Sequence, residues 1–145
     1  MDSKVNLILN LLRASVLLNR TGLKLVEGTA IASVQQWQLL GIIAENEGIC
    51  LSKLCEDTLV TKQNITGLVD RMRRAGMIEA WSDPEDKRMT RLRLTPDGAR
   101  TLEEIRPRAE ASNEAMLEAF SEEELGRFDE MVQRLVRSLR AQSGA

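Results

Sequence analysis

Hydrophobic residues recur with helical spacing along most of the chain, and the spacing changes to alternation over one short stretch. Apolar residues at i, i+3, i+4 and i+7 in the middle of the chain predict a helix with a single buried stripe. These residues are Ile65, Leu68, Val69 and Met72. The stretch 90–94 instead alternates leucine with arginine, which is typical of a strand with one buried face. The pattern predicts a mainly α fold with a small β-hairpin.

The first helix is unusually rich in apolar residues. We expect it to begin after Ser3, a good N-cap, and nine of the fourteen residues from Val5 to Leu18 are Val, Leu or Ile. A helix that is apolar on more than one side must be covered on more than one side. Because a chain of this length has little left to cover it, the sequence predicts a partner subunit.

Three further helices follow. Ser33 and Gln36 form a capping box for the second helix, and Gly48 is its expected C′ residue. Residues 51–56 predict a short third helix with Ser52 as N-cap, and Thr61 caps a fourth helix that ends at Gly76. In a helical projection, the side opposite the buried stripe of this fourth helix is polar. It consists of Gln63, Thr66, Gly67, Asp70, Arg71 and Arg74.

The C-terminal half begins with the hairpin and ends in two helices. Residues 77–81 and 90–94 are the expected strands, and Thr95 with Pro96 starts a long helix in which Pro107 predicts a kink or a short interruption. A second capping box at Ser121 opens the last helix, whose apolar residues suit packing against another long helix. These residues are Leu125, Phe128, Val132, Leu135 and Leu139. This order predicts a winged helix-turn-helix between helical extensions, in one domain over 1–145, with residues 1–30 and 101–145 for dimerisation and 31–100 for DNA binding.

Composition excludes several classes of protein. A chain of 145 residues is one domain's length, no apolar run exceeds six residues, and the first residues do not resemble a secretory signal. Two cysteines provide no disulfide framework, which points to the cytoplasm. Histidine is absent, which removes Ser-His-Asp and Cys-His nucleophiles and His-ligated metal sites. We therefore expect no enzyme, no metal and no cofactor.

Charge is concentrated in the middle of the chain. The net charge is −2, yet residues 61–100 hold nine basic and six acidic side chains. A helix-turn-helix places the N-terminal residues of its second helix against base edges. Here these residues are Thr61, Lys62, Gln63, Asn64 and Thr66. Basic side chains of the same helix would face phosphates, which are Lys62, Arg71, Arg73 and Arg74.

The hairpin adds basic groups to the same region. Lys87 and Arg88 lie near its tip, where an arginine can enter a narrow minor groove. Arg91 and Arg93 would add phosphate contacts from the strand.

Residues 51–98 resemble the multiple antibiotic resistance regulator (MarR) family of transcription factors. Three segments carry the resemblance: Leu51-Ser-Lys-Leu54 with Glu56; Thr66-Gly-Leu-Val-Asp-Arg-Met-Arg-Arg-Ala-Gly-Met-Ile78; and Asp83-Pro-Glu-Asp-Lys-Arg88 with Leu94, Thr95 and Gly98. The resemblance implies a homodimer that binds a pseudo-palindromic operator as a repressor, with Arg88 in the minor groove and positions 62–67 reading the major groove. It also implies release of DNA by a small phenolic or anionic ligand bound between the dimerisation and DNA-binding parts.

Some positions depart from the family pattern. Gly67 stands where a polar or basic side chain is usual, Glu79 and Ala80 replace residues that are commonly basic, and Leu59 replaces a frequent glycine. Fewer phosphate contacts predict modest affinity.

The sensing mechanism stays open at this point. Leu11, Leu12 and Trp37 are candidates to line a ligand pocket, or they are plain core residues. A thiol switch would use Cys50 or Cys55, and an intrachain disulfide between them is disfavoured by helical geometry after Ser52. A winged-helix module that binds another protein rather than DNA is the remaining alternative.

Overall fold

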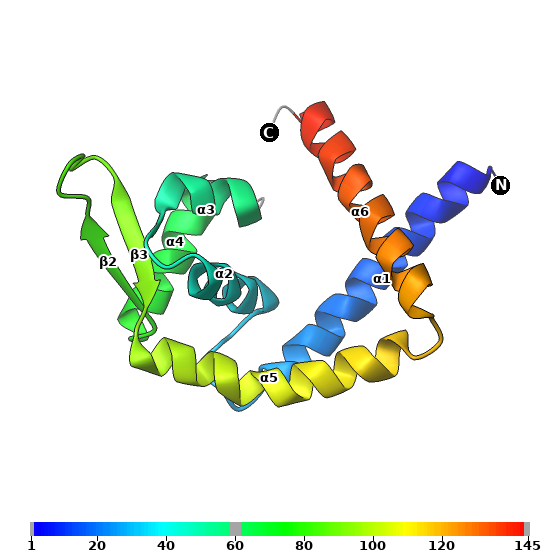
Figure 1. Ribbon diagram of the computed structural model, residues 1–145, viewed down its shortest axis with the longest axis horizontal. Coiled ribbons are helices and arrows are strands. Elements are labelled where there is room, and N and C mark those ends of the chain that lie inside the picture. Colours follow the sequence, from blue (N-terminus) through cyan, green and yellow to red (C-terminus); the bar gives the residue numbers. More distant parts are fainter. Residues whose placement is uncertain (1, 59–61, 144–145) are drawn as a thin grey trace. The chain divides into compact units, whose positions relative to one another are not determined.

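The computed structural model describes residues 2–58 and 62–143 (Figure 1). In chain order the elements are α1 (Ser3–Leu25), α2 (Val34–Glu45), β1 (Ile49–Cys50), α3 (Leu51–Thr58), α4 (Lys62–Arg74), β2 (Ile78–Ser82), β3 (Thr90–Leu94), α5 (Pro96–Leu117) and α6 (Glu122–Ser143). The chain divides into two compact units, residues 1–109 and 110–145. The predicted order of helices and hairpin is confirmed.

The hairpin belongs to a three-stranded antiparallel sheet in the order β1-β3-β2. Ile78 pairs with Leu94 and Ser82 with Thr90, which sets the register of the two long strands. The short strand β1 pairs Ile49 with Leu92 and was not predicted, because two residues are too few to show an alternating pattern. Through β1, the sheet connects the hairpin directly to the start of α3.

The core of the first unit lies between α2, α3, α4, the sheet and the first half of α5. Its largest fully buried side chains are Val26, Leu39, Leu40, Ile43, Leu54, Ile65, Met72, Leu92 and Ile105. The predicted stripe of α4 is confirmed, since Ile65 and Met72 are fully buried and Leu68 and Val69 nearly so. Each such aliphatic side chain stabilises the fold by roughly 1.5–3 kcal/mol through its removal from water. This packing fixes which side of α4 faces outward.

Several predicted helix starts and ends were wrong by one to three residues. Asp2, rather than Ser3, caps α1, because its carboxylate accepts from the Lys4 N–H at 3.2 Å. α2 ends at Glu45 with Asn46 as C-cap, so Gly48 lies beyond it in a turn with φ +87°. α3 begins at Leu51, before Ser52, and extends to Thr58. In each case a residue near the expected cap took its place.

Other caps were predicted correctly. Ser33 Oγ accepts from the Gln36 N–H, although Gln36 Oε1 accepts in return from the Ala32 N–H and not from that of Ser33. Thr95 Oγ1 accepts from the Gly98 N–H at the start of α5. At the start of α6, the Glu124 N–H donates to Ser121 Oγ and the Ser121 N–H donates to Glu124 Oε1, at 3.1 and 2.9 Å.

The interruption predicted at Pro107 does not occur. The helix α5 continues through this proline from Pro96 to Leu117.

Large apolar side chains stay exposed on the long helices of both units. On α1 they include Leu7, Leu12, Val16, Leu17 and Leu18, and on α5, α6 and the turn between them Met116, Leu117, Phe120, Phe128, Met131 and Leu139. The predicted stripe of α6 is thus only partly covered within the chain. None of the described helices is long and apolar enough to cross a membrane.

Candidate nucleic-acid interface

The outward face of α4 carries the polar side chains that the sequence predicts for base contacts. Gln63, Asn64 and Thr66 are exposed, and Gly67 is half-buried at the centre of the face. Lys62 is the first residue of α4, and its side chain, like the whole of Thr61, lies outside what the structure describes. Three of the five predicted base-contact residues are therefore exposed on α4.

α4 ends in a tight turn that leads directly into β2. The Gly76 N–H donates to the Arg73 carbonyl at 2.9 Å and the Met77 N–H donates to the Met72 carbonyl at 3.0 Å, with Gly76 at φ +78°. This pair of hydrogen bonds defines a Schellman motif, in which a glycine takes the left-handed conformation. α4 ends at Arg74, two residues before the predicted end, and Gly76 is the C′ residue of the turn that fixes where the wing begins relative to α4.

The basic side chains of α4 differ in their partners. Arg74 is paired with Asp70 one turn earlier, at 2.9 Å. Arg71 instead donates from Nε to the Gly67 carbonyl oxygen at 3.3 Å. The two arginines thus lie on the same exposed face in different electrostatic settings.

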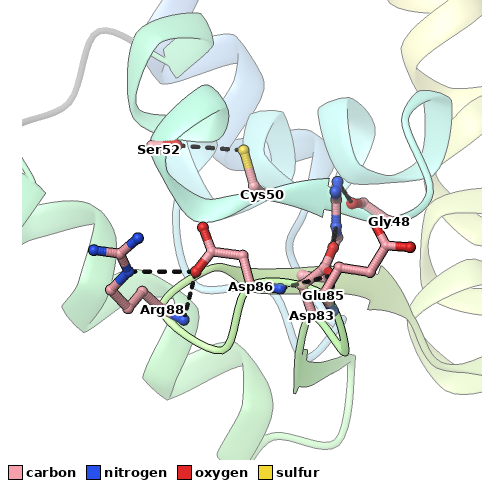
Figure 2. Close-up of polar contacts among 8 residues, drawn as sticks. Gly48, Cys50, Ser52, Asp83, Glu85, Asp86 and Arg88 are labelled. Carbon is pink, nitrogen blue, oxygen red and sulfur yellow. Dashed lines mark hydrogen bonds and ion pairs between the residues drawn. The ribbon is translucent and has the colours of Figure 1, made fainter.

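The loop of the wing is held by a network centred on Asp83 (Figure 2). Asp83 Oδ1 accepts from the backbone N–H groups of Glu85 and Asp86, at 2.8 and 3.3 Å. Its Oδ2 accepts from Arg91 Nε at 2.9 Å. The Glu85 N–H and then the Arg91 guanidinium hold the pKa of the Asp83 carboxyl below its ordinary value. The loop is therefore ordered by an ionised aspartate.

Arg88 projects from this ordered loop. Its side chain is 93% exposed, while its backbone N–H and its Nε donate to Asp86 Oδ1 at 3.1 and 3.4 Å (Figure 2). Lys87 beside it is also exposed. An anchored base with a projecting guanidinium is the geometry that insertion into a minor groove requires.

The two strand arginines are engaged within the protein. Arg91 is half-buried, and besides Asp83 it reaches the Gly48 carbonyl oxygen from Nη1 at 3.0 Å, which ties the wing to the segment before β1. Arg93 pairs with Glu79 at 2.7 Å and lies 5.1 Å from the centre of the Trp81 ring. Phosphate contacts by Arg91 and Arg93 stay predictions, and each contact competes with an existing partner.

The candidate ligand-pocket residues have different surroundings. Leu12 lines a shallow groove of about 440 Å³ on α1 together with Leu9, Arg13 and Val16. Trp37 is half-buried and packs against the core of the first unit, and Leu11 is half-buried on α1. A pocket formed by Leu11, Leu12 and Trp37 stays a prediction.

Cys50 occupies a position that the sequence analysis did not recognise. It lies directly before α3, and its thiol is 3.3 Å from the Ser52 hydroxyl (Figure 2). The Ser52 hydroxyl and then the Lys53 backbone N–H lower the pKa of the Cys50 thiol. Cys50 thus takes the N-cap place that we expected for Ser52. Cysteine is not among the favoured N-cap residues, so its residue type gave no signal for this position.

Cys50 and Cys55 line the same cavity, of about 350 Å³, between α3 and the wing. Its other walls are Leu51, Ser52, Arg88, Met89 and Thr90. Cys55 packs against the core, as its place in the helix predicts. Among the described residues, no three Cys, Asp or Glu side chains are arranged to hold a metal ion.

Residues 33–89, which span α2 to the wing, match a family model described as the MarR family. The chain belongs to the MarR family. It is 30% identical over 106 residues to the HTH-type transcriptional repressor IacR of Pseudomonas putida, a match that covers 73% of this chain and 59% of that protein. With the transcriptional activatory protein BadR of Rhodopseudomonas palustris it shares 29% identity over 125 residues, or 83% and 71% of the two chains.

Solved structures of MarR-type regulators share the fold. AbsC of Streptomyces coelicolor superposes with a TM-score of 0.87 at 21% identity, over 97% of each chain. FabT of Streptococcus pneumoniae, solved in complex with DNA, gives 0.71 at 21% identity, over 96% of this chain and 97% of FabT. PcaV of Streptomyces coelicolor, solved with its natural ligand, gives 0.76 at 23% identity, over 92% and 91%.

MarR-family proteins are DNA-binding transcription regulators and not enzymes. The chain spans 62% and 48% of the lengths of two further curated regulators that it matches, FarR of Neisseria gonorrhoeae and YsmB of Bacillus subtilis.

Proposed function

We propose that this protein is a homodimeric, sequence-specific DNA-binding repressor that acts in the bacterial cytoplasm and leaves its operator when a small-molecule effector binds. The observation that carries the proposal is the surface formed by α4 and the wing. One compact unit presents the exposed polar face of α4 together with Arg88, which projects from a loop held by Asp83. A recognition helix for the major groove and an arginine for the minor groove are the two parts that winged-helix readout needs.

The homodimer is supported by the uncovered apolar side chains of the long helices. On α1, Leu12 is 59% exposed and Leu17 57%, and on α6 Met131 is 55% exposed. Exposed apolar patches of this extent mark interfaces, because water contact with them is unfavourable. A two-fold dimer would place its recognition helices at half-sites about one helical turn apart, near 34 Å.

Repression and effector release are supported by analogy to single relatives. IacR is named as a repressor, and PcaV was solved with a natural ligand. The effector expected here is a small phenolic or anionic molecule.

Fluorescence anisotropy tests the DNA-binding part of the proposal. The labelled duplex is the region upstream of the protein's own coding sequence, and the competitor is a scrambled duplex of equal length, over a series of salt concentrations. We expect tight binding of the upstream duplex only, with an affinity that falls steeply as salt rises, because phosphate contacts release counterions. Equal binding of both duplexes at all salt concentrations would contradict sequence-specific recognition.

The wing is tested by Arg88→Ala, with Arg100→Ala as the matched control. Arg100 is an exposed arginine of α5 that pairs with Asp97 at 2.7 Å and lies outside the proposed surface. We expect Arg88→Ala to weaken operator binding and to reduce the salt slope by about 1, with the melting temperature unchanged. Arg100→Ala should leave both quantities unchanged. Equal effects of the two substitutions would remove Arg88 from the interface. No binding of any duplex at low salt would favour the protein-binding alternative.

A second candidate for the release mechanism is a thiol switch at Cys50. The Ser52 hydroxyl, which lowers the pKa of the Cys50 thiol, and the cavity that Cys50 shares with Arg88 favour it. In this mechanism the Cys50 thiolate attacks one oxygen of hydrogen peroxide and the O–O bond breaks, which gives a sulfenic acid and a hydroxide ion that takes up a proton from solvent to become water. A larger polar group at position 50 would then lie beside the base of the wing.

Treatment with peroxide separates the two mechanisms. If Cys50 is the sensor, peroxide weakens operator binding by the wild type, dithiothreitol restores it, and Cys50→Ser is insensitive. If wild type and Cys50→Ser retain the same affinity after treatment, the thiol switch at Cys50 is excluded.

A further inference from the structure

The residue in the middle of the exposed face of α4 is a glycine, Gly67, and the side chain of Arg71 lies over it. Gly67 occupies the centre of this face, and Arg71 follows one helical turn later. Because Cα–Cβ bonds in a helix tilt toward its N-terminus, a long side chain at i+4 lies over residue i. Arg71 Nε accordingly donates to the Gly67 carbonyl oxygen at 3.3 Å, and its Nη2 lies 3.5 Å from the place that a Cβ of residue 67 would take.

The location of this guanidinium determines what it meets on DNA. When a recognition helix enters the major groove, the centre of its exposed face is nearest to the base edges, and the phosphates lie along the two sides of the groove. The charge of Arg71 by itself predicts a phosphate contact. The guanidinium over Gly67 instead lies where base edges would be.

The anchoring bond leaves the end of the side chain available. A guanidinium has five N–H donors, and the bond to the Gly67 carbonyl uses the one on Nε. The four donors on Nη1 and Nη2 remain, and two of them can donate side by side to O6 and N7 of guanine. Because the anchor restrains the side chain before DNA binds, less conformational entropy is lost on contact.

Arg74 provides a contrast on the same face. Its Nη2 is paired with Asp70 at 2.9 Å, so part of its charge is already compensated. Within residues 2–58 and 62–143, no carboxylate forms an ion pair with Arg71. Arg74 therefore suits a supporting role at phosphates, while the Nη groups of Arg71 are not compensated by a carboxylate within the described residues.

We propose that Arg71, held across Gly67, reads one guanine in each operator half-site and is a specificity-determining residue of this protein. The inference rests on the proposed function, in that α4 enters the major groove. In the family pattern a polar or basic side chain stands at position 67, where this chain has Gly67. The inference predicts that the base contact of that position is made here by Arg71, one turn away.

Selection of duplexes from a randomised library, followed by sequencing, tests the assignment. Wild type is compared with Arg71→Ala, Arg71→Lys and the control Arg74→Ala, each confirmed as folded by circular dichroism. Wild type should require guanine at one position per half-site. Arg71→Ala should lose that preference by about tenfold to a hundredfold and keep the preferences at all other positions. Arg71→Lys retains the charge without the planar fork and should lose most of the same preference.

The two remaining variants test the geometry. Arg74→Ala should weaken binding of all sequences about equally and leave every base preference intact, as expected for a phosphate contact. Gly67→Gln fills the space over which Arg71 lies. In the wild-type background, Gly67→Gln should change the base preference at the base pair that Arg71 contacts. In the Arg71→Ala background, the same substitution should have a different effect at that base pair.

Two outcomes would overturn the inference in distinguishable ways. If Arg71→Ala weakens binding of all sequences equally and selects the same bases as wild type, Arg71 contacts phosphate and the assignment is wrong. If folded wild type enriches no sequence from the library, sequence-specific DNA binding fails, and the inference fails with it.

Discussion

Gly98 lies in the first turn of α5 and is required there by close packing against the end of the α4–β2 turn. A Cβ at this position would overlap the Met77 carbonyl oxygen, which is backbone and has no freedom to move away. We expect Gly98→Ala to lower the free energy of unfolding by about 1–3 kcal/mol, because the contact forces a backbone shift. Denaturation in urea measures it. Gly41→Ala in α2 is the control, since a Cβ there meets nothing within 4 Å. A loss no larger than the control's would contradict this account of the packing.

Cys50 yields a pH-dependent prediction at the same scale. The Ser52 hydroxyl and the Lys53 N–H stabilise the thiolate, so the thiol pKa lies below its ordinary value. In a Cys55→Ala background, the rate of alkylation by iodoacetamide should therefore rise with pH to half its maximum at a pH below the ordinary thiol pKa. Ser52→Ala removes the principal donor and should move this midpoint to higher pH. An unchanged midpoint would show that Ser52 does not set the pKa.

Some residue-scale features were accessible from the sequence and others were not. The stripe of α4 and the caps Thr95 and Ser121 follow from local spacing alone, and all were predicted. The tie between Arg91 and Gly48 joins residues 43 positions apart, so no local pattern contains it. Arg71 is a different case, because its relation to Gly67 is local, one helical turn apart. Its charge predicts a phosphate contact, and the relation to Gly67 appears only when the direction of the side chain is considered.

At the scale of elements, the loop of the wing is ordered by hydrogen bonds to the Asp83 carboxylate and not by a hydrophobic core. The loop between β2 and β3 has few apolar residues, and Asp83 holds it through two backbone N–H groups and Arg91. The turn-rich sequence 83–86 predicts a loop here. It does not distinguish a flexible loop from this one, because order depends on Arg91 across the hairpin.

This organisation predicts loss of order in the wing at acid pH. The pKa of Asp83 is lowered in the folded protein, so its stabilising contribution is complete above the ordinary carboxyl pKa and is lost as pH falls through the lowered value. Amide hydrogen exchange at Glu85 and Asp86, followed by NMR from neutral to acid pH, should show loss of protection in that range. In Asp83→Asn, an amide oxygen can still accept from these N–H groups, but it does not titrate. Equal acid dependence in the two proteins would exclude Asp83 as the responsible group.

At the scale of the whole molecule, the sequence predicts that a partner subunit covers α1. It does not predict which residues of the partner make the contact. The nine aliphatic residues between Val5 and Leu18 exceed what one chain can cover, and α1 is exposed along most of its length. The charge distribution follows the same division, because the basic excess lies in residues 61–100 while the chain as a whole carries −2. Binding to DNA would therefore depend on a local surface, and folding on the association of two chains.

Coupling between association and folding is directly measurable. If the exposed apolar residues of α1 pack against a second copy, the melting temperature must rise with protein concentration, because mass action favours the dimer over unfolded monomers. Leu12→Glu combined with Val16→Glu places two charges on this surface. We expect the double variant to sediment as a monomer and to melt at a lower temperature that is independent of concentration. Asn10→Asp, an exposed polar position of the same helix, should leave dimer and melting temperature nearly unchanged. A wild type that sediments as a monomer at micromolar concentration would exclude the homodimer, and with it the two-fold operator that it implies.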